Sequence, residues 1–170
     1  VDVVKHTGSG PEKRQLTAHP HTAVRSPSGK LFAVCDKGND TVRMYMLDRE
    51  KKKLIRPKHV YQHSPGTLPR YCVFHPEKPW FYHNSESCMQ LHAFDYTEDG
   101  VLREIGTSSA LPPDCETREK AVEQQGLVMD HGGRYIYDIV RGPNVVTVFQ
   151  VDQQDGSVRP VQHQPIRGRG

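Results

Sequence analysis

Closely spaced cysteines are missing from this chain of 170 residues. Its four cysteines lie far apart in the sequence and form no C-x-x-C pair; they are Cys35, Cys72, Cys88 and Cys115. This spacing fits neither a zinc site nor a dense disulfide framework. We therefore expect a protein of a reducing, cytoplasmic compartment.

Long apolar runs and blocks of like charge are missing as well. No apolar run approaches the roughly 18 residues that a membrane helix needs, and residues 1–10 contain no signal-peptide core. The 23 basic and 20 acidic residues are interspersed and give a formal net charge of +3 with neutral histidines. Neither a nucleic acid nor a membrane is therefore predicted as a partner.

Helical patterns are nearly missing too, whereas strand patterns are frequent. Thr41–Leu47 and Val145–Val151 are rich in β-branched and aromatic residues with a period of two, which is typical of strands. Ser26–Gly29 and Asp130–Gly133 have the residues of hairpin turns. Glu116–Gln125 lies in a long connection and is predicted to be a loop.

Three segments of the chain repeat one pattern of strands and turns. Each has two short apolar runs joined by a polar turn, then a polar corner, an alternating third run and a weaker fourth strand. The turn residues Lys30, Pro79 and Arg134 are spaced by roughly 50 residues, close to the length of a β-propeller blade. The sequence therefore predicts an all-β protein with about three four-stranded propeller blades, at approximately 21–61, 70–109 and 125–163.

Three blades are too few for a closed ring, because propellers close with about four to eight blades. We therefore expect a single partial propeller domain over residues 1–170, with the missing blades supplied by the rest of a longer chain. Residues 1–20 are predicted to be the exit from a preceding blade.

Polar residues stand at equivalent positions of the three repeats. The start of the innermost strand and the end of the next strand face the channel mouth of a propeller. These positions hold His21, Arg70 and Gln125, followed by Lys37, Glu86 and Arg141. Ionisable groups at strand ends are costly unless solvated or paired, so this ring predicts a site. The alternative is that they are ordinary strand-end residues, with Arg70 and Glu86 as a structural ion pair.

The charges of this ring favour an anionic ligand. With His21 neutral, the cations Lys37, Arg70 and Arg141 exceed the single carboxylate of Glu86 by two positive charges. Arginines bind a carboxylate, a phosphate or a developing oxyanion, and histidine and glutamate transfer protons near neutral pH.

Three motifs resemble one known family. They are His19-Pro-His-Thr-Ala-Val24 followed by Ser26–Gly29, Gly66-x-x-Pro69-Arg70-Tyr71 leading to Phe74-His75-Pro76, and Gly8-Ser-Gly-Pro11. These motifs resemble the lactonase family of seven-bladed propellers, which includes bacterial 6-phosphogluconolactonases and fungal carboxy-cis,cis-muconate cyclases. The resemblance implies a metal-free active site with a histidine, two arginines and a glutamate. The matching positions are His21, Arg70, Glu86 and Arg141.

The function that the resemblance implies is hydrolysis of a sugar lactone, with 6-phosphogluconolactone as the first candidate and the pentose phosphate pathway as the context. His21 or Glu86 is expected to activate water, and the arginines to bind the anionic group or the oxyanion. Lys37, Gln125 and His19 are the expected substrate-binding residues. No cofactor is expected. His19 and His21 could supply two metal ligands, but no third ligand has suitable spacing.

Two other functions remain open at this point. A muconate cyclase would close a lactone with the same positive ring of side chains. A non-catalytic propeller would bind partners on its flat faces. No Trp-Asp or Gly-His repeat signature supports the second alternative.

Overall fold

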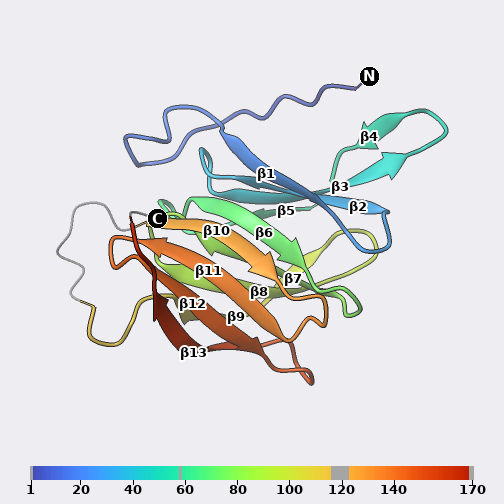
Figure 1. Ribbon diagram of the computed structural model, residues 1–170. Coiled ribbons are helices and arrows are strands. Elements are labelled where there is room, and N and C mark those ends of the chain that lie inside the picture. Colours follow the sequence, from blue (N-terminus) through green and yellow to red (C-terminus); the bar gives the residue numbers. More distant parts are fainter. Residues whose placement is uncertain (1, 58, 116–122, 169–170) are drawn as a thin grey trace.

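The computed structural model of the chain describes residues 2–57, 59–115 and 123–168, and Figure 1 shows their arrangement. Within these ranges the regular secondary structure consists of β-strands alone, so the all-β prediction is confirmed. Over the same residues, no helix is long and apolar enough to cross a membrane. The loop predicted at 116–125 lies outside the described residues as far as residue 122, and a strand begins at Glu123.

The strands form three antiparallel sheets that follow one another along the chain. The first contains β1 (Pro20–Arg25), β2 (Leu31–Asp36), β3 (Thr41–Asp48), β4 (Lys53–Ile55) and β5 (Val60–Gln62). The second contains β6 (Pro69–Phe74), β7 (Trp80–Ser85), β8 (Gln90–Tyr96) and β9 (Leu102–Ser109). The third contains β10 (Glu123–Met129), β11 (Tyr135–Arg141), β12 (Val145–Val151) and β13 (Val158–Pro165).

The first strands of the three sheets lie side by side, as the innermost strands of propeller blades do. Strand β6 lies between β1 and β10 (Figure 1), and the last strands of the second and third sheets, β9 and β13, are also in contact. The sheets of the described chain form an arc that does not close into a ring. A partial propeller of three blades is therefore the architecture.

The first sheet differs from the prediction of four strands, because its outermost position is shared by two short strands. Strand β4 pairs with the end of β3 at 46–48, and β5 pairs with the start of β3 at 41–43. The chain leaves the sheet between them. The first sheet consequently has five strands, whereas the second and third have four.

Each first strand contains a β-bulge at the same place. The register between β1 and β2 shifts between Pro20 and Thr22, and the register between β6 and β7 shifts between Pro69 and Cys72. The third sheet repeats the shift between Gln124 and Leu127. Bulges change the direction of a side chain and are common next to active sites.

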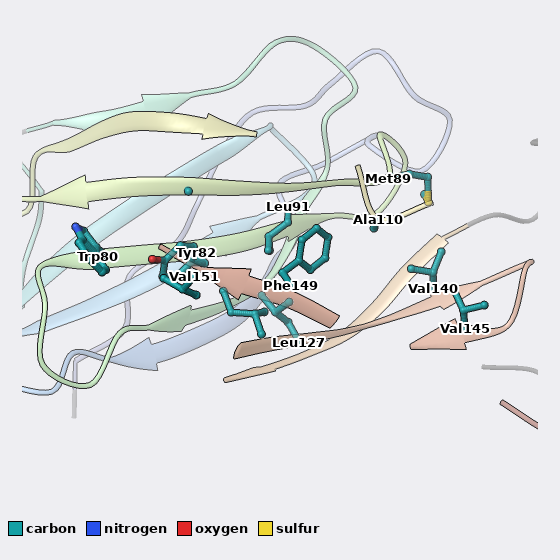
Figure 2. Close-up of a cluster of buried hydrophobic side chains, with 12 residues drawn as sticks. Trp80, Tyr82, Met89, Leu91, Ala110, Leu127, Val140, Val145, Phe149 and Val151 are labelled. Atoms are coloured by element: carbon teal, nitrogen blue, oxygen red, sulfur yellow. The ribbon is translucent and has the colours of Figure 1, made fainter. Parts of the chain in front are cut away.

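Two apolar clusters hold the sheets together. The first joins the first and second sheets through Ala33, Cys35, Val42, Met44, Cys72, Phe74, Phe81 and Phe94. The second joins the second and third sheets, and Figure 2 shows Tyr82, Leu91 and Phe149 among its members. Tyr82 and Phe149 are fully buried, so each contributes the burial of a large aromatic ring to the packing between sheets.

A turn that contains Gly156 packs against the second cluster beside Trp80 and Tyr82. Gly156 has φ of +78°, and its carbonyl accepts a hydrogen bond of 3.0 Å from the Tyr82 hydroxyl. A Cβ atom at this position would stand 2.6 Å from the Trp80 ring. Only glycine therefore fits both the backbone and the space.

A buried polar network also joins the second and third sheets, and we call it the amide seam. It consists of Asn84, Ser85, Gln124 and Asp138, all fully buried. Asn84 Nδ2 donates to Asp138 Oδ1 over 2.9 Å, and Gln124 Nε2 donates to Asp138 Oδ2. Burial outweighs these bonds and raises the pKa of Asp138 to about 7.

Residues 2–19 pack against the first sheet. His6 Nδ1 lies 2.6 Å from Asp36 Oδ2, and Gln15 Nε2 donates to Asp40 Oδ1 over 2.8 Å. Gln15 is fully buried, so its side chain holds this segment, which has no strand of its own, against the first sheet. The same segment contains Arg14, which forms an ion pair with Glu86 at the end of β7 in the second sheet.

Candidate functional site

The three bulges place the first predicted residue of each repeat. His21 is the extra residue of β1, Arg70 lies in the bulge of β6, and Gln125 lies in the bulge of β10. The second predicted residues stand at the end of the neighbouring strand, with Lys37 directly after β2, Glu86 directly after β7 and Arg141 as the last residue of β11. The repeat comparison thus selected equivalent positions of three sheets.

Glu86 lies at the centre of a cluster of polar side chains, which we call the mouth cluster. Its other members are Arg14, His21, Lys37, Arg70, Glu123 and Arg141. Glu86 Oε2 lies 2.7 Å from Lys37 Nζ and 2.9 Å from Arg70 Nε. Its Oε1 accepts a hydrogen bond of 2.6 Å from Arg14 Nη1. Three cations from three different segments therefore meet at one carboxylate.

These cations determine the charge state of Glu86. Burial alone would raise the pKa of this carboxyl, but hydrogen bonds from Lys37 and Arg14 and the charges of Lys37 and Arg70 lower it below the ordinary value. Glu86 is consequently ionised at neutral pH. A carboxylate that is held this way is a weak proton acceptor.

Arg70 extends the cluster to the third sheet. Its Nη1 donates to the Gln125 side-chain oxygen over 2.8 Å and also contacts the backbone carbonyls of Gln124 and Gln125. These contacts fix the plane of the guanidinium, whose Cζ atom lies 5.2 Å from the centre of the Tyr71 ring. Gln125 in turn donates to Glu123 Oε2 over 2.9 Å.

Arg141 lies at one remove from Glu86. Its Nη1 is 3.7 Å from Glu123 Oε2, and Glu123 Oε1 is 2.9 Å from Arg14 Nη1. Arg14 therefore bridges the two carboxylates, and Arg141 joins the cluster through Glu123. The side chains of Arg14 and Arg141 are 45% and 43% exposed, which leaves both accessible to a ligand.

His21 lies beside the cations without an ion pair of its own among the described residues. Its ring meets the Tyr71 ring edge-on at 5.0 Å, and Nδ1 lies 3.0 Å from the Thr22 hydroxyl. Burial, with the charges of Arg70 and Lys37, lowers its pKa to about 4. His21 is consequently neutral at pH 7, with a ring nitrogen available to accept a proton.

His19 lies before β1, with its ring 6.3 Å from that of His21. Its backbone N–H donates to Asp36 Oδ1 over 2.6 Å, whereas its side chain is exposed. The structure therefore brings His19 near the mouth cluster but not into its hydrogen-bond network among the described residues.

Sequence reasoning missed two members of the mouth cluster, Arg14 and Glu123. Arg14 belongs to the segment before the first repeat, and Glu123 belongs to the connection that was predicted to be a loop. With both included, four cations face two carboxylates and the excess of two positive charges is preserved. The cluster has the charge to attract an anion and a neutral imidazole to take up a proton.

Comparison with known proteins adds a family to this geometry. The family model described as "Lactonase, 7-bladed beta-propeller" matches residues 1–170. The chain belongs to this family. It is also 29% identical over 169 residues to the 6-phosphogluconolactonase of Bacillus subtilis, covering 99% of this chain and 47% of that protein. The chain therefore spans about half the length of the curated relatives it matches.

Solved structures show the same blades. A protein from Lactobacillus plantarum aligns with a TM-score of 0.89 and 26% identity, covering 99% of this chain and 48% of its own. The periplasmic gluconolactonase PpgL of Pseudomonas aeruginosa aligns with a TM-score of 0.86 at 24% identity, covering 97% of this chain and 46% of its own. The similarity to the Pseudomonas aeruginosa protein shows a shared fold.

Proposed function

We propose that the complete protein is a lactonase that hydrolyses an anionic sugar lactone, with 6-phosphogluconolactone as the preferred substrate and 6-phosphogluconate as the product. The observation that carries the proposal is the mouth cluster, in which a neutral histidine stands beside an excess of positive charge. Membership of the lactonase family and the name of the Bacillus subtilis relative support the same chemistry.

In the proposed mechanism His21 acts as the general base. It removes a proton from water, whose oxygen attacks the lactone carbonyl and forms a tetrahedral oxyanion. The C–O bond to the ring oxygen then breaks, and the imidazolium returns its proton to that oxygen. Water is consumed and the hydroxy acid is released.

Glu86 has a different task in this mechanism. Because Lys37 and Arg70 hold it ionised, it is the counter-charge that positions these two cations. Lys37 and Arg70 then stabilise the oxyanion, and the exposed guanidiniums of Arg14 and Arg141 bind the phosphate of the substrate. Of the two proton-transfer candidates in the sequence, the proposal thus selects His21.

A pair of histidine variants in the complete protein tests the proposal. His21→Asn should lower kcat by a factor of about 10² to 10⁴, the usual contribution of a general base. The melting temperature should change little, because His21 is half-buried and has no ion pair among the described residues. The matched control is His131→Asn, an exposed change in the turn before β11, which should leave turnover unchanged.

The assay measures enzymatic minus spontaneous lactone hydrolysis, on 6-phosphogluconolactone and on unphosphorylated gluconolactone. The phosphorylated lactone should give the higher kcat/KM. Activity should fall as the pH drops through about 4, where His21 becomes protonated. Full activity of His21→Asn would contradict its role as base, and absence of lactone turnover in the unmodified protein would contradict the function.

A further inference from the structure

Three histidines meet between the first and second sheets, away from the mouth cluster, and we call them the histidine triad. His63 follows β5, whereas His83 and His92 are directly paired across β7 and β8. Their exposed fractions are 7%, 0% and 6%. One ring nitrogen from each can be chosen so that all three lie within 4.8 Å of one another.

The hydrogen bonds of His83 direct a lone pair into the triad. Its Nδ1 lies 3.1 Å from the Asn84 carbonyl oxygen, which can only accept, so Nδ1 carries the proton. Its Nε2 is then unprotonated and lies 2.9 Å from His63 Nε2. Metal-binding histidines have the same arrangement, in which the outer ring nitrogen donates to a backbone carbonyl or a carboxylate.

His92 has no hydrogen bond that would explain its burial. Neither of its ring nitrogens has a partner within hydrogen-bond distance among the described residues. Leaving a buried polar group unpaired is costly. A carboxylate stands beside it, because Glu104 Oε1 is 3.7 Å from His92 Nδ1, and Glu104 Oε2 accepts a hydrogen bond of 2.6 Å from the Tyr61 hydroxyl.

Burial acts in the same direction on the pKa of all three imidazoles. Burial lowers the pKa of His63 to about 3, and it lowers the pKa values of His83 and His92 as well. The nearby Glu104 carboxylate opposes this shift at His92 without reversing it.

We propose that the histidine triad binds one divalent transition-metal ion of the zinc type, with Glu104 as the fourth ligand. Three imidazoles and one carboxylate are a donor set that suits Zn²⁺. Because Zn–N distances are about 2.0–2.1 Å and the coordination is tetrahedral, the nitrogens on one ion lie about 3.3 Å apart. The nitrogens of the triad now lie within 4.8 Å of one another, and the rings of His83 and His92 are stacked, so binding requires these side chains to rotate toward a common centre.

The role of this ion is structural. His63 follows the last strand of the first sheet, and the other three ligands belong to the second sheet, so the ion joins two blades. An ion that binds the folded protein alone stabilises it by mass action. None of the four ligands belongs to the mouth cluster, so this proposal stands or fails independently of lactone hydrolysis.

Metal titration of the tag-free, chelator-treated protein tests the site. Calorimetry with ZnCl₂ should give one ion per chain and a higher melting temperature. CoCl₂ should give the intense visible absorption of four-coordinate Co²⁺. His92→Gln should weaken zinc binding by at least roughly 100-fold, the upper end of the cost of losing one supporting hydrogen bond at a metal site.

Two further variants keep the test decisive. Glu104→Gln changes a partly exposed side chain, so its folding is secure, and it should weaken zinc binding by about 10-fold or more and alter the Co²⁺ spectrum. His75→Gln is the matched control, because His75 is equally buried and lies outside the triad; its zinc affinity should be unchanged. Absence of stoichiometric binding, or binding that survives both His92→Gln and Glu104→Gln, overturns the proposal.

Discussion

Glu86 and Asp138 are both buried carboxyls, one directly after β7 and the other in the middle of β11, yet their surroundings are opposite. The mouth cluster surrounds Glu86 with Arg14, Lys37 and Arg70, and its pKa is lowered. The amide seam surrounds Asp138 with Asn84 and Gln124, and its pKa rises to about 7. Burial is common to both, so the partners decide the charge.

This difference separates two tasks. The mouth cluster concentrates charge, and several of its side chains remain accessible to solvent. The amide seam has four fully buried members and satisfies its polar groups with neutral amides. We therefore expect substitutions in the mouth cluster to change activity, and substitutions in the amide seam to change stability.

The largest expected effect is a pH dependence of stability caused by Asp138. Its pKa is raised from 3.8 to about 7 in the folded state, so the folded protein binds this proton more tightly than the unfolded chain. Its contribution is complete below about pH 4 and is lost as the pH rises through about 7, a change of about 4 kcal/mol. Urea unfolding at a series of pH values measures it.

Asp138→Asn should remove this slope, because the side chain no longer titrates. Glu86 should give the opposite sign, since a lowered pKa stabilises above the unfolded value and loses that contribution as the pH falls through the folded one. A stability profile that is unchanged by Asp138→Asn would refute the contrast between the two carboxyls.

The second effect concerns catalysis. Glu86→Gln in the complete protein should lower lactone turnover by about 10² to 10³, because Lys37 and Arg70 lose the charge that orients them toward the oxyanion. The comparison is with Glu77→Gln, an exposed change in the turn before β7 that should leave turnover unaltered. Normal turnover in Glu86→Gln would return Glu86 to a purely structural ion pair.

The third effect is one of backbone and packing. Gly156→Ala should destabilise the protein by about 2–3 kcal/mol, since it places a Cβ at a positive φ and against the Trp80 ring. Gly106→Ala on β9 is the control, because nothing lies within 4 Å of its added Cβ. Equal unfolding midpoints for the two variants would show that the turn yields to the extra methyl group.

The smallest effect is expected at Arg14. Arg14→Gln should raise KM for the phosphorylated lactone by less than about tenfold and leave the melting temperature nearly unchanged, because the Arg14 side chain is 45% exposed and Lys37 and Arg70 still neutralise Glu86. The increase should shrink at high salt, which screens this guanidinium. A large fall in kcat instead would place Arg14 in the chemical step.

Much of the fold could be predicted because strands have a local signature. The alternating segment Val145–Val151 coincides with β12, and Thr41–Leu47 is one residue shorter than β3. The division of the outer strand into β4 and β5 could not be predicted, because both are three residues long and pair with one partner strand. Segments this short have no measurable periodicity.

The mouth cluster was only partly predictable for a related reason. His21, Arg70 and Glu86 occupy repeat positions, so their proximity follows from the symmetry of the blades. Arg14 lies outside the repeat, and only the docking of Gln15 into the first sheet brings it there. The histidine triad could not be predicted, because His63 follows the short strand β5 and the sequence does not show which blade position this strand occupies.

The position of Arg14 in the chain also sets an order of events during synthesis. Its two carboxylate partners, Glu86 and Glu123, lie 72 and 109 residues further along. At about 5–20 residues per second, the ribosome needs roughly 5–20 s to add the second partner after Arg14. The first sheet can therefore be complete before either carboxylate of the mouth cluster has been synthesised.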